Sequence, residues 1–233
     1  MSLGKGLINV GLPVCRTDSI YPFGPDNNFT SNVATYQLDG NANDTTGNFS
    51  GTASNITYTT GHIDNSAVFN GSESSTRSKI TTSGLTTYNN FSISFWANPD
   101  DVNNTRLAMG TSDSFSTQTG FGIFFGLTGN GNLTWRVSNG SSTVDLEQSS
   151  ISTGNWYHIV ITQNISNNEK KLYVNGSLEA TSTSTINATG QGHSLIIGGY
   201  NNYVNTPYDG KLDQVRIFDR TITASEVATL YAE

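Results

Sequence analysis

The feature that most constrains the fold is a series of short apolar runs separated by clusters of Gly, Asn and Ser. From Val33 to the end of the chain, runs and clusters alternate at regular spacing. Each run has the length of one strand, and each cluster holds the residue types that form turns. This spacing is typical of antiparallel sandwiches and barrels, and the sequence therefore predicts an all-β fold.

Three runs carry more detail. "FSISFWA" (91–97) places Phe and Ile on alternate positions, which predicts a strand with one apolar face. "WYHIVIT" (156–162) is bulky on both faces, which predicts a central strand. In "KKLYVNGSLEAT", Asn175 and Gly176 can both adopt the positive φ of a type I′ turn, which predicts a hairpin. Further strands are expected at 67–69, 78–81, 106–110, 121–127, 132–138, 194–199 and 211–218.

The two ends of the chain differ from this pattern. Residues 1–30 hold prolines and no strand-like alternation, and their apolar run is too broken for a good signal peptide. We interpret them as an N-terminal arm or docking segment before one sandwich domain, residues 31–233. At the other end, Thr223 and Glu226 form a capping box, which predicts one short C-terminal helix.

Composition excludes several classes of partner. Only 12% of the 233 residues are charged and the net charge is −7, so the surface must be built largely from Ser, Thr, Asn and Gly. A nucleic-acid binder needs a basic patch, which this sequence lacks, and an anionic membrane surface would repel the chain. The single cysteine, Cys15, cannot form a disulfide within the chain.

A cluster of side-chain oxygens follows the first apolar run, in "LDGNAND". Asp39, Asn41 and Asp44 lie within six residues. Asp and Asn favour turns, because they bond to their own backbone, but their oxygens also suit a hard cation such as Ca²⁺. No Glu lies twelve positions on, so an EF-hand is excluded. The cluster therefore predicts either Asx turns or a calcium site.

A second group of residues suggests recognition of sugars. The segment "GGYNNYVNTPYDG" holds Tyr200, Asn202, Tyr203 and Tyr208. Aromatic rings can pack against the C–H faces of a sugar, and amides can bond to its hydroxyls. We predict that these four residues form a ligand-binding loop; the alternative is that the rings pack back onto the sandwich. A second polar loop, 110–120, carries Phe115.

Six stretches in order along the chain resemble one family, the LamG-like jelly rolls within the concanavalin A-like lectin/glucanase sandwiches. They are "YQLDGNANDTTG", "SAVFNGS", "FSISFWANPD", "GNWYHIVIT", "KLYVNGSLEAT" and "GKLDQVRIFDRTITASEV". The resemblance implies a jelly roll of two antiparallel sheets packed face to face. It also implies a structural Ca²⁺ at a sandwich edge, with Asp213 joining the first acidic cluster. The leader resembles LamG-containing virion proteins of marine cyanobacterial phages.

Glucanases of this fold carry an E-x-D-x-E strand, and this chain does not. The nearest approach is Asp145 and Glu147, which share a strand face but lack the third acid. His158 lies within an apolar strand and is expected to be a core histidine bonded to a polar neighbour. We therefore assign no catalytic residues and expect no enzymatic activity.

The sequence favours a non-catalytic carbohydrate-binding or adhesion module, located on a phage virion or in another extracellular assembly. Its expected partners are a glycan on a host surface and, through the arm, virion proteins. The alternative is a structural decoration protein that binds no glycan, and a glycoside hydrolase is less favoured because the acidic motif is absent.

Overall fold

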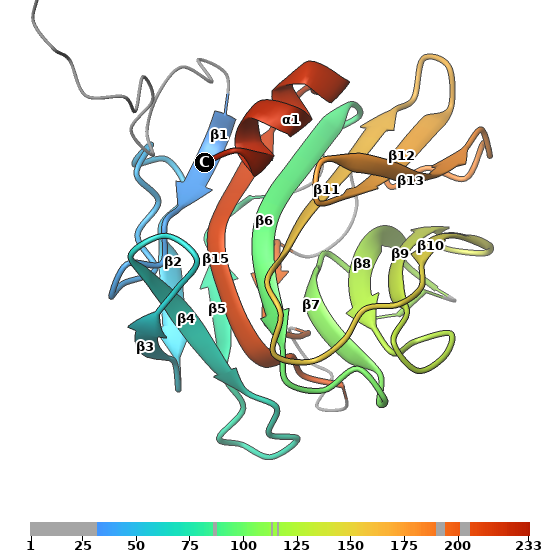
Figure 1. Ribbon diagram of the computed structural model, residues 1–233. Helices are drawn as coiled ribbons and strands as arrows, with labels where there is room; N and C mark the ends of the chain where they lie inside the picture. Colours follow the sequence, from blue (N-terminus) through green and yellow to red (C-terminus); the bar gives the residue numbers. More distant parts are fainter. Residues whose placement is uncertain (1–31, 86–87, 113, 116, 190–193, 201–205) are drawn as a thin grey trace, which may run out of the picture.

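The computed structural model describes residues 32–85, 88–112, 114–115, 117–189, 194–200 and 206–233. The predicted arm lies outside these residues. Two antiparallel sheets pack face to face with one short helix on the outside, as Figure 1 shows, and this confirms the predicted sandwich class.

The first sheet, sheet A, has eight strands. Its long central strand, β15, pairs with β6 on one side and with both β4 and β1 on the other. In spatial order the strands are β13 (Ser177–Ser182), β12 (Glu169–Val174), β11 (Tyr157–Asn164), β6 (Phe91–Pro99), β15 (Asp209–Phe218), β4 (Asn65–Asn70) and β3 (Thr57–Thr60), with β1 (Asn32–Tyr36) beside β15.

The second sheet, sheet B, has seven strands. In spatial order they are β10 (Thr143–Gln148), β9 (Leu133–Asn139), β8 (Thr119–Phe125), β7 (Arg106–Gly110), β14 (Ile196–Ile197), β5 (Lys79–Thr82) and β2 (Gly51–Ser54). Strands β10 to β7 are consecutive in the chain, but β14 lies between β7 and β5, which are distant from it in the sequence. Such crossovers are why the order cannot be deduced from strand positions alone.

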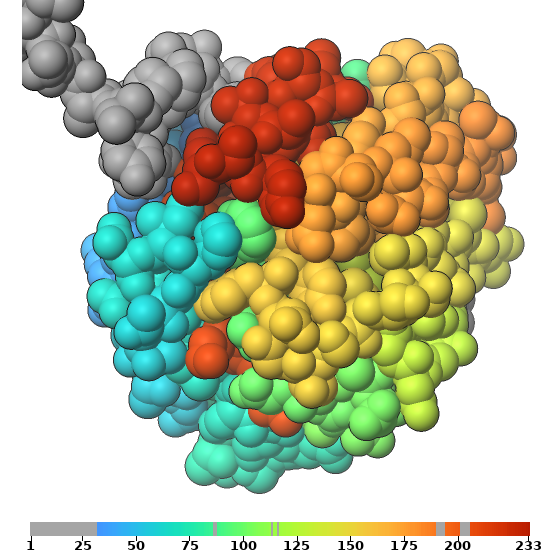
Figure 2. All heavy atoms as spheres, in the orientation of Figure 1, coloured from blue at the N-terminus to red at the C-terminus, as the bar shows by residue number. Residues whose placement is uncertain are grey.

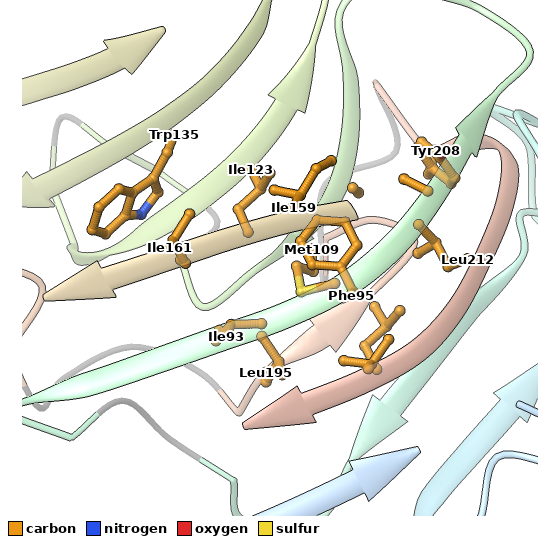
Figure 3. Packing of buried hydrophobic residues seen from close by; sticks show 14 of the residues in the cluster. Ile93, Phe95, Met109, Ile123, Trp135, Ile159, Ile161, Leu195, Tyr208 and Leu212 are labelled. Atoms are coloured by element: carbon orange, nitrogen blue, oxygen red, sulfur yellow. The ribbon is translucent and has the colours of Figure 1, made fainter. Parts of the chain in front are cut away.

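The core lies between the two sheets and is formed by the inward positions of both. Figure 3 shows Phe95 and Ile159 of sheet A facing Ile123 and Trp135 of sheet B. All four side chains are fully buried. The alternation seen in the sequence therefore corresponds to a real inner face, which is what stabilises a sandwich of this kind.

Most predicted strands are present, including the central position of β11 between β6 and β12 and the hairpin at Asn175–Gly176. The differences are at the edges. Strands β2 and β3 were not predicted, because both are short, rich in Thr and Ser, and largely exposed. Such strands have no apolar periodicity, and their pairing partners decide their conformation.

The C-terminal helix α1 (Ala224–Tyr231) begins at the predicted capping box of Thr223 and Glu226. Its buried residues, Val227 and Leu230, join a second apolar cluster on the outer face of sheet A. Figure 2 shows the helix, in red, lying beside the β12–β13 hairpin, in orange. The helix therefore covers part of sheet A and leaves sheet B without a helical layer among the described residues.

One glycine gives a direct test of the packing between the sheets. Gly198 has a φ of +89°, and a Cβ there would lie 2.1 Å from ring atoms of Phe69. Gly84 has a similar φ of +76° but open space around it. We expect Gly84→Ala to cost about 1–2 kcal/mol for the left-handed backbone alone. Gly198→Ala should cost roughly 1–3 kcal/mol more, because the core is overpacked.

Urea denaturation of both variants measures the difference in unfolding free energy. Equal losses for Gly198→Ala and Gly84→Ala would contradict the packing described here.

Candidate functional site

Two loops that the sequence analysis associated with recognition meet on the outer face of sheet B. The ring of Phe115 lies 5.6 Å from that of Phe124 on β8, and the ring of Tyr200 lies 6.4 Å from the same ring, measured between centroids. Phe124 is buried beneath them, while Phe115 and Tyr200 are half-buried. We call this surface, with Arg136 and Asp145 beside it, the Tyr200 face.

The sequence of β8 explains why the loop can lie so close to the sheet. Gly120 and Gly122 occupy outward positions of this strand, where other strands carry side chains. A Cβ at Gly122 would lie 2.9 Å from the ring of Phe115. The Ser138 hydroxyl, on neighbouring β9, donates to the Phe115 carbonyl at 2.9 Å. The glycines therefore make room for Phe115, and Ser138 fixes its loop in place.

An ion pair borders these rings. Arg136 on β9 lies opposite Asp145 on β10. The Arg136 Nε donates to Asp145 Oδ1 at 2.8 Å, and a terminal nitrogen donates to Oδ2 at 2.6 Å. The hydrogen bonds that it donates to Asp145 raise the pKa of the Arg136 guanidinium. Both side chains are about a quarter exposed (26% and 22%), so the pair can still offer donors and acceptors to a ligand.

The prediction that Tyr208 belongs to the surface loop is wrong. Its ring is fully buried and packs against Phe69 and Phe125, with centroids 5.8 and 5.6 Å away. Figure 3 shows it among the core residues. Tyr208 directly precedes β15, so its side chain enters the space between the sheets. Asn202 and Tyr203 lie outside the described residues. Of the four predicted residues, the structure places Tyr200 at the surface beside Arg136, which the sequence analysis did not identify.

Asp145 and Glu147, the two acids nearest to a glucanase motif, are not arranged as a catalytic pair. Asp145 gives both oxygens to Arg136, and Glu147, two residues on, is exposed on the same strand. His158 is buried, and its Nε2 lies 2.8 Å from the Ser94 hydroxyl, as expected for a core histidine. Burial lowers the pKa of His158 to about 3, so the ring is neutral at physiological pH.

Two of the four predicted metal ligands are used by the backbone instead. Asp44 accepts hydrogen bonds from the backbone N–H groups of four residues, which are Thr35, Thr46, Asn48 and Phe49. Burial opposes its ionisation, but these bonds and that from the Thr46 hydroxyl outweigh it and lower the pKa of Asp44. Asn41 accepts from the Asn43 N–H at 2.9 Å, which is an Asx turn. The turn interpretation therefore accounts for both residues.

The other two predicted ligands, Asp39 and Asp213, lie close together, and both accept hydrogen bonds from the turn between β3 and β4 and the first residue of β4. Asp39 accepts from the Asn65 N–H at 2.8 Å, and Asp213 Oδ2 accepts from the N–H groups of His62 and Ile63 at 2.9 Å. Asp213 is fully buried, and its Oδ1 has no hydrogen-bond partner. Burial raises the pKa of Asp213 to about 7 against these N–H bonds, and the nearby Asp39 raises it further.

These observations narrow the calcium prediction without testing it. The orphaned oxygen of Asp213 and the adjacent Asp39 suit a cation, whereas Asp44 and Asn41 do not fit, since their oxygens serve the turn. Within the described residues, no three His, Cys, Asp or Glu side chains gather in a way that could hold a metal. A calcium ion here would need backbone or water oxygens beside the two carboxylates. None of the helical sequence in the described part of the chain is long and apolar enough to cross a membrane.

Comparison with known proteins agrees with the fold. The family model of the concanavalin A-like lectin/glucanases superfamily (Laminin_G_3) matches residues 72–228. Domain 4 of AbnA, a GH43 extracellular arabinanase from Geobacillus stearothermophilus solved in complex with arabinotriose, is similar with a TM-score of 0.73 and 26% identity. That match covers 86% of this chain and 98% of the domain.

The binding domains of two other proteins are similar in fold. The receptor-binding domain of botulinum neurotoxin D matches with a TM-score of 0.69 and 20% identity, over 87% of this chain and 52% of that one. The binding domain of Paraclostridial Mosquitocidal Protein 1 matches with a TM-score of 0.68 and 20% identity, over 86% and 52%. This chain thus spans about half of each. No curated protein sequence matches it.

The narrowed calcium site makes a prediction for thermal stability. Calcium should raise the melting temperature, because a ligand that binds only the folded state stabilises it. A raised carboxyl pKa means that stability is greatest below the unfolded value and falls as pH rises through about 7, as Asp213 loses its proton in the buried site. The calcium effect should therefore be larger at pH 8 than at pH 5, and Asp213→Asn should remove it.

The control is Asp44→Asn, which should lower the melting temperature through lost turn bonds yet keep the calcium response. A melt that chelator leaves unchanged at pH 8, in protein first shown to be calcium-loaded, would exclude the site.

Proposed function

The chain belongs to the concanavalin A-like lectin/glucanases superfamily, and we propose that it is a non-catalytic carbohydrate-binding module. The observation that carries the proposal is the Tyr200 face, where two half-buried rings lie beside a partly exposed Arg136–Asp145 pair. The AbnA domain supports it, since that domain was solved with arabinotriose and matches nearly its whole length here.

The face offers the two kinds of contact that a sugar needs. The rings of Tyr200 and Phe115 present apolar area to the C–H groups of a sugar ring. Arg136 offers N–H donors and Asp145 offers acceptors to the hydroxyls, and each already has its geometry fixed by the other. Because the rings are anchored by Phe124 and by the Ser138 hydrogen bond, little ordering is required on binding.

The same pair argues for binding rather than hydrolysis. A general acid must carry a proton, and a nucleophile must present a free oxygen to the anomeric carbon. Both oxygens of Asp145 accept hydrogen bonds from Arg136, so neither is free to attack a sugar. Glu147 is exposed on the same strand, and no third acid completes the E-x-D-x-E pattern. These contacts support a non-catalytic role.

A module of this kind is useful where many copies are displayed together. An open face buries little of a small sugar, so the affinity of one site should be weak, and clustering would supply avidity. We propose that the module belongs to an extracellular assembly or phage virion, anchored by residues 1–30, with a host-surface glycan as its ligand. A structural decoration protein is the alternative outcome of the test below.

The first test uses Tyr200→Ala and the protein clustered on beads. Capture of arabinan, or of a glycan identified on an array, should fall at least about tenfold, a loss of about 1.4 kcal/mol per site. Capture by the parent should change little between low and physiological salt, because a neutral sugar carries no charge to screen. The matched control is Tyr231→Ala, which removes a 42% exposed tyrosine of helix α1, outside sheet A, and should leave capture intact.

Equal capture by Tyr200→Ala and the parent would remove the Tyr200 face as the site. If the clustered parent captured no glycan on the array, the decoration role would replace the binding role.

The second test concerns catalysis. We expect no reducing sugar to be released from arabinan, laminarin or alginate, because the E-x-D-x-E motif is absent and Arg136 engages both oxygens of Asp145. Turnover that disappeared in Asp145→Asn or Glu147→Gln would contradict the non-catalytic proposal. Reducing-end assays on purified parent and variants measure it directly.

A further inference from the structure

A hollow in the surface lies outside the Tyr200 face. It is formed by the turn between β2 and β3, by the segment after β4, and by the start of β5, and its volume is 560 Å³. This lies within the roughly 300–1,000 Å³ that is usual for ligand sites. We call it the Arg77 groove, defined by Ser54, Asn55, Glu73, Arg77 and Lys79 together with the adjacent serines 74 and 75.

The wall of the groove is held in shape by amide side chains. Asn70 accepts from the N–H groups of Ser72 and Ser78 at 3.1 and 3.2 Å, and it donates to the Thr76 carbonyl at 2.9 Å. Across the groove, Asn55 donates to the Arg77 carbonyl at 3.1 Å. These bonds join the two sides, so the hollow has a defined form before any ligand arrives.

Strand periodicity turns two cations toward the groove. Ser78 is buried and Ile80 belongs to the core, so Arg77 and Lys79, which alternate with them, lie on the outer side. The carboxylate of Glu73 lies 3.8 Å from Arg106, which itself bonds more closely to Asp101 at 2.9 Å. The chain has only 11 basic residues and a net charge of −7. Two of these basic residues, Arg77 and Lys79, nevertheless line one groove that contains a single acid, Glu73.

The lining residues differ in kind from those of the Tyr200 face. Every described residue that lines the groove is a serine, an asparagine or a charged residue, and none is aromatic. A ligand here would be held by hydrogen bonds and charge rather than by ring stacking. Arg binds a carboxylate or a sulfate through two parallel bonds, Lys adds a point charge, and serines and asparagine suit sugar hydroxyls.

We propose that the Arg77 groove binds a sugar unit that carries an anionic group, a carboxylate or a sulfate, within an acidic polysaccharide. The choice of a saccharide rests on the proposed function, whereas the anionic group rests on Arg77 and Lys79. The groove and the Tyr200 face border the same sheet, with β14 and β7 between β5 and β8. At about 4.8 Å per strand, β5 and β8 are only about 14 Å apart, so one polysaccharide can reach both sites.

The test compares three probes, which are polygalacturonate, dextran sulfate and neutral arabinan. Arg77→Gln/Lys79→Gln should weaken capture of one or both polyanions at least about tenfold and leave arabinan capture unchanged. The polyanion that loses binding identifies the group as carboxylate or sulfate. Capture by the parent should also fall steeply between low and high salt, because the contacts are ionic.

The control is Lys171→Gln/Lys211→Gln, which removes the same charge outside the groove and should retain polyanion capture. Equal capture by the groove variant and the parent would overturn the proposal, as would an equal loss in the control or a parent that binds neither polyanion. Melting temperatures confirm that each variant is folded. Tyr200→Ala should keep polyanion capture. If the parent captures a polyanion but no arabinan, only the proposed function of the Tyr200 face is overturned.

Discussion

The bulge at Asp213 and Gln214 is the constraint on which sheet A depends. Along one edge of β15, residues 209–212 pair with β4 and residues 215–218 pair with β1, and the change of partner occurs at the bulge. The register with β6 shifts at the same place, and Gln214 has a φ of +49°. At this bulge, the carboxylate of Asp213 accepts hydrogen bonds from the N–H groups of His62 and Ile63. Removing it would leave the two backbone donors without this acceptor in a partly buried turn.

Many polar side chains in this protein form hydrogen bonds with the backbone and are therefore explained without a ligand. Asp44 holds the turn after β1, Asn70 holds the segment after β4, and Lys170 is fully buried with its Nζ bonded to the Ser184 carbonyl and to Asn187 at 2.9 and 2.7 Å. Burial lowers the pKa of Lys170 to about 8, because removal from water disfavours the charged ammonium group. In a chain with so few charges, a polar cluster must therefore be compared with nearby amides before it is assigned to a metal or a substrate.

The outer faces of the two sheets differ in what covers them. Helix α1 packs against Val160, Tyr173 and Phe218 of sheet A and covers part of that sheet. On sheet B, by contrast, outward glycines of β8 leave space that Phe115 occupies, and Arg136 and Asp145 remain partly exposed beside it. A face of this composition, with fixed rings and a fixed ion pair, is suited to recognition of a neutral polar ligand. The groove at the other end of the same sheet carries charge without rings and is suited to an anionic one.

The sequence by itself determined the class of fold, the central strands and the capped helix, because apolar periodicity and capping residues are local signals. It also identified Tyr200 and Phe115, but it could not place them together, since their loops are joined only through pairing of β7, β8 and β14. Only the tertiary structure decided that Tyr208 enters the core and that Asp44 serves a turn. It also decided that Arg136 faces Asp145. Each of these depends on register across strands distant in the chain, where a shift of one residue moves a side chain to the opposite face.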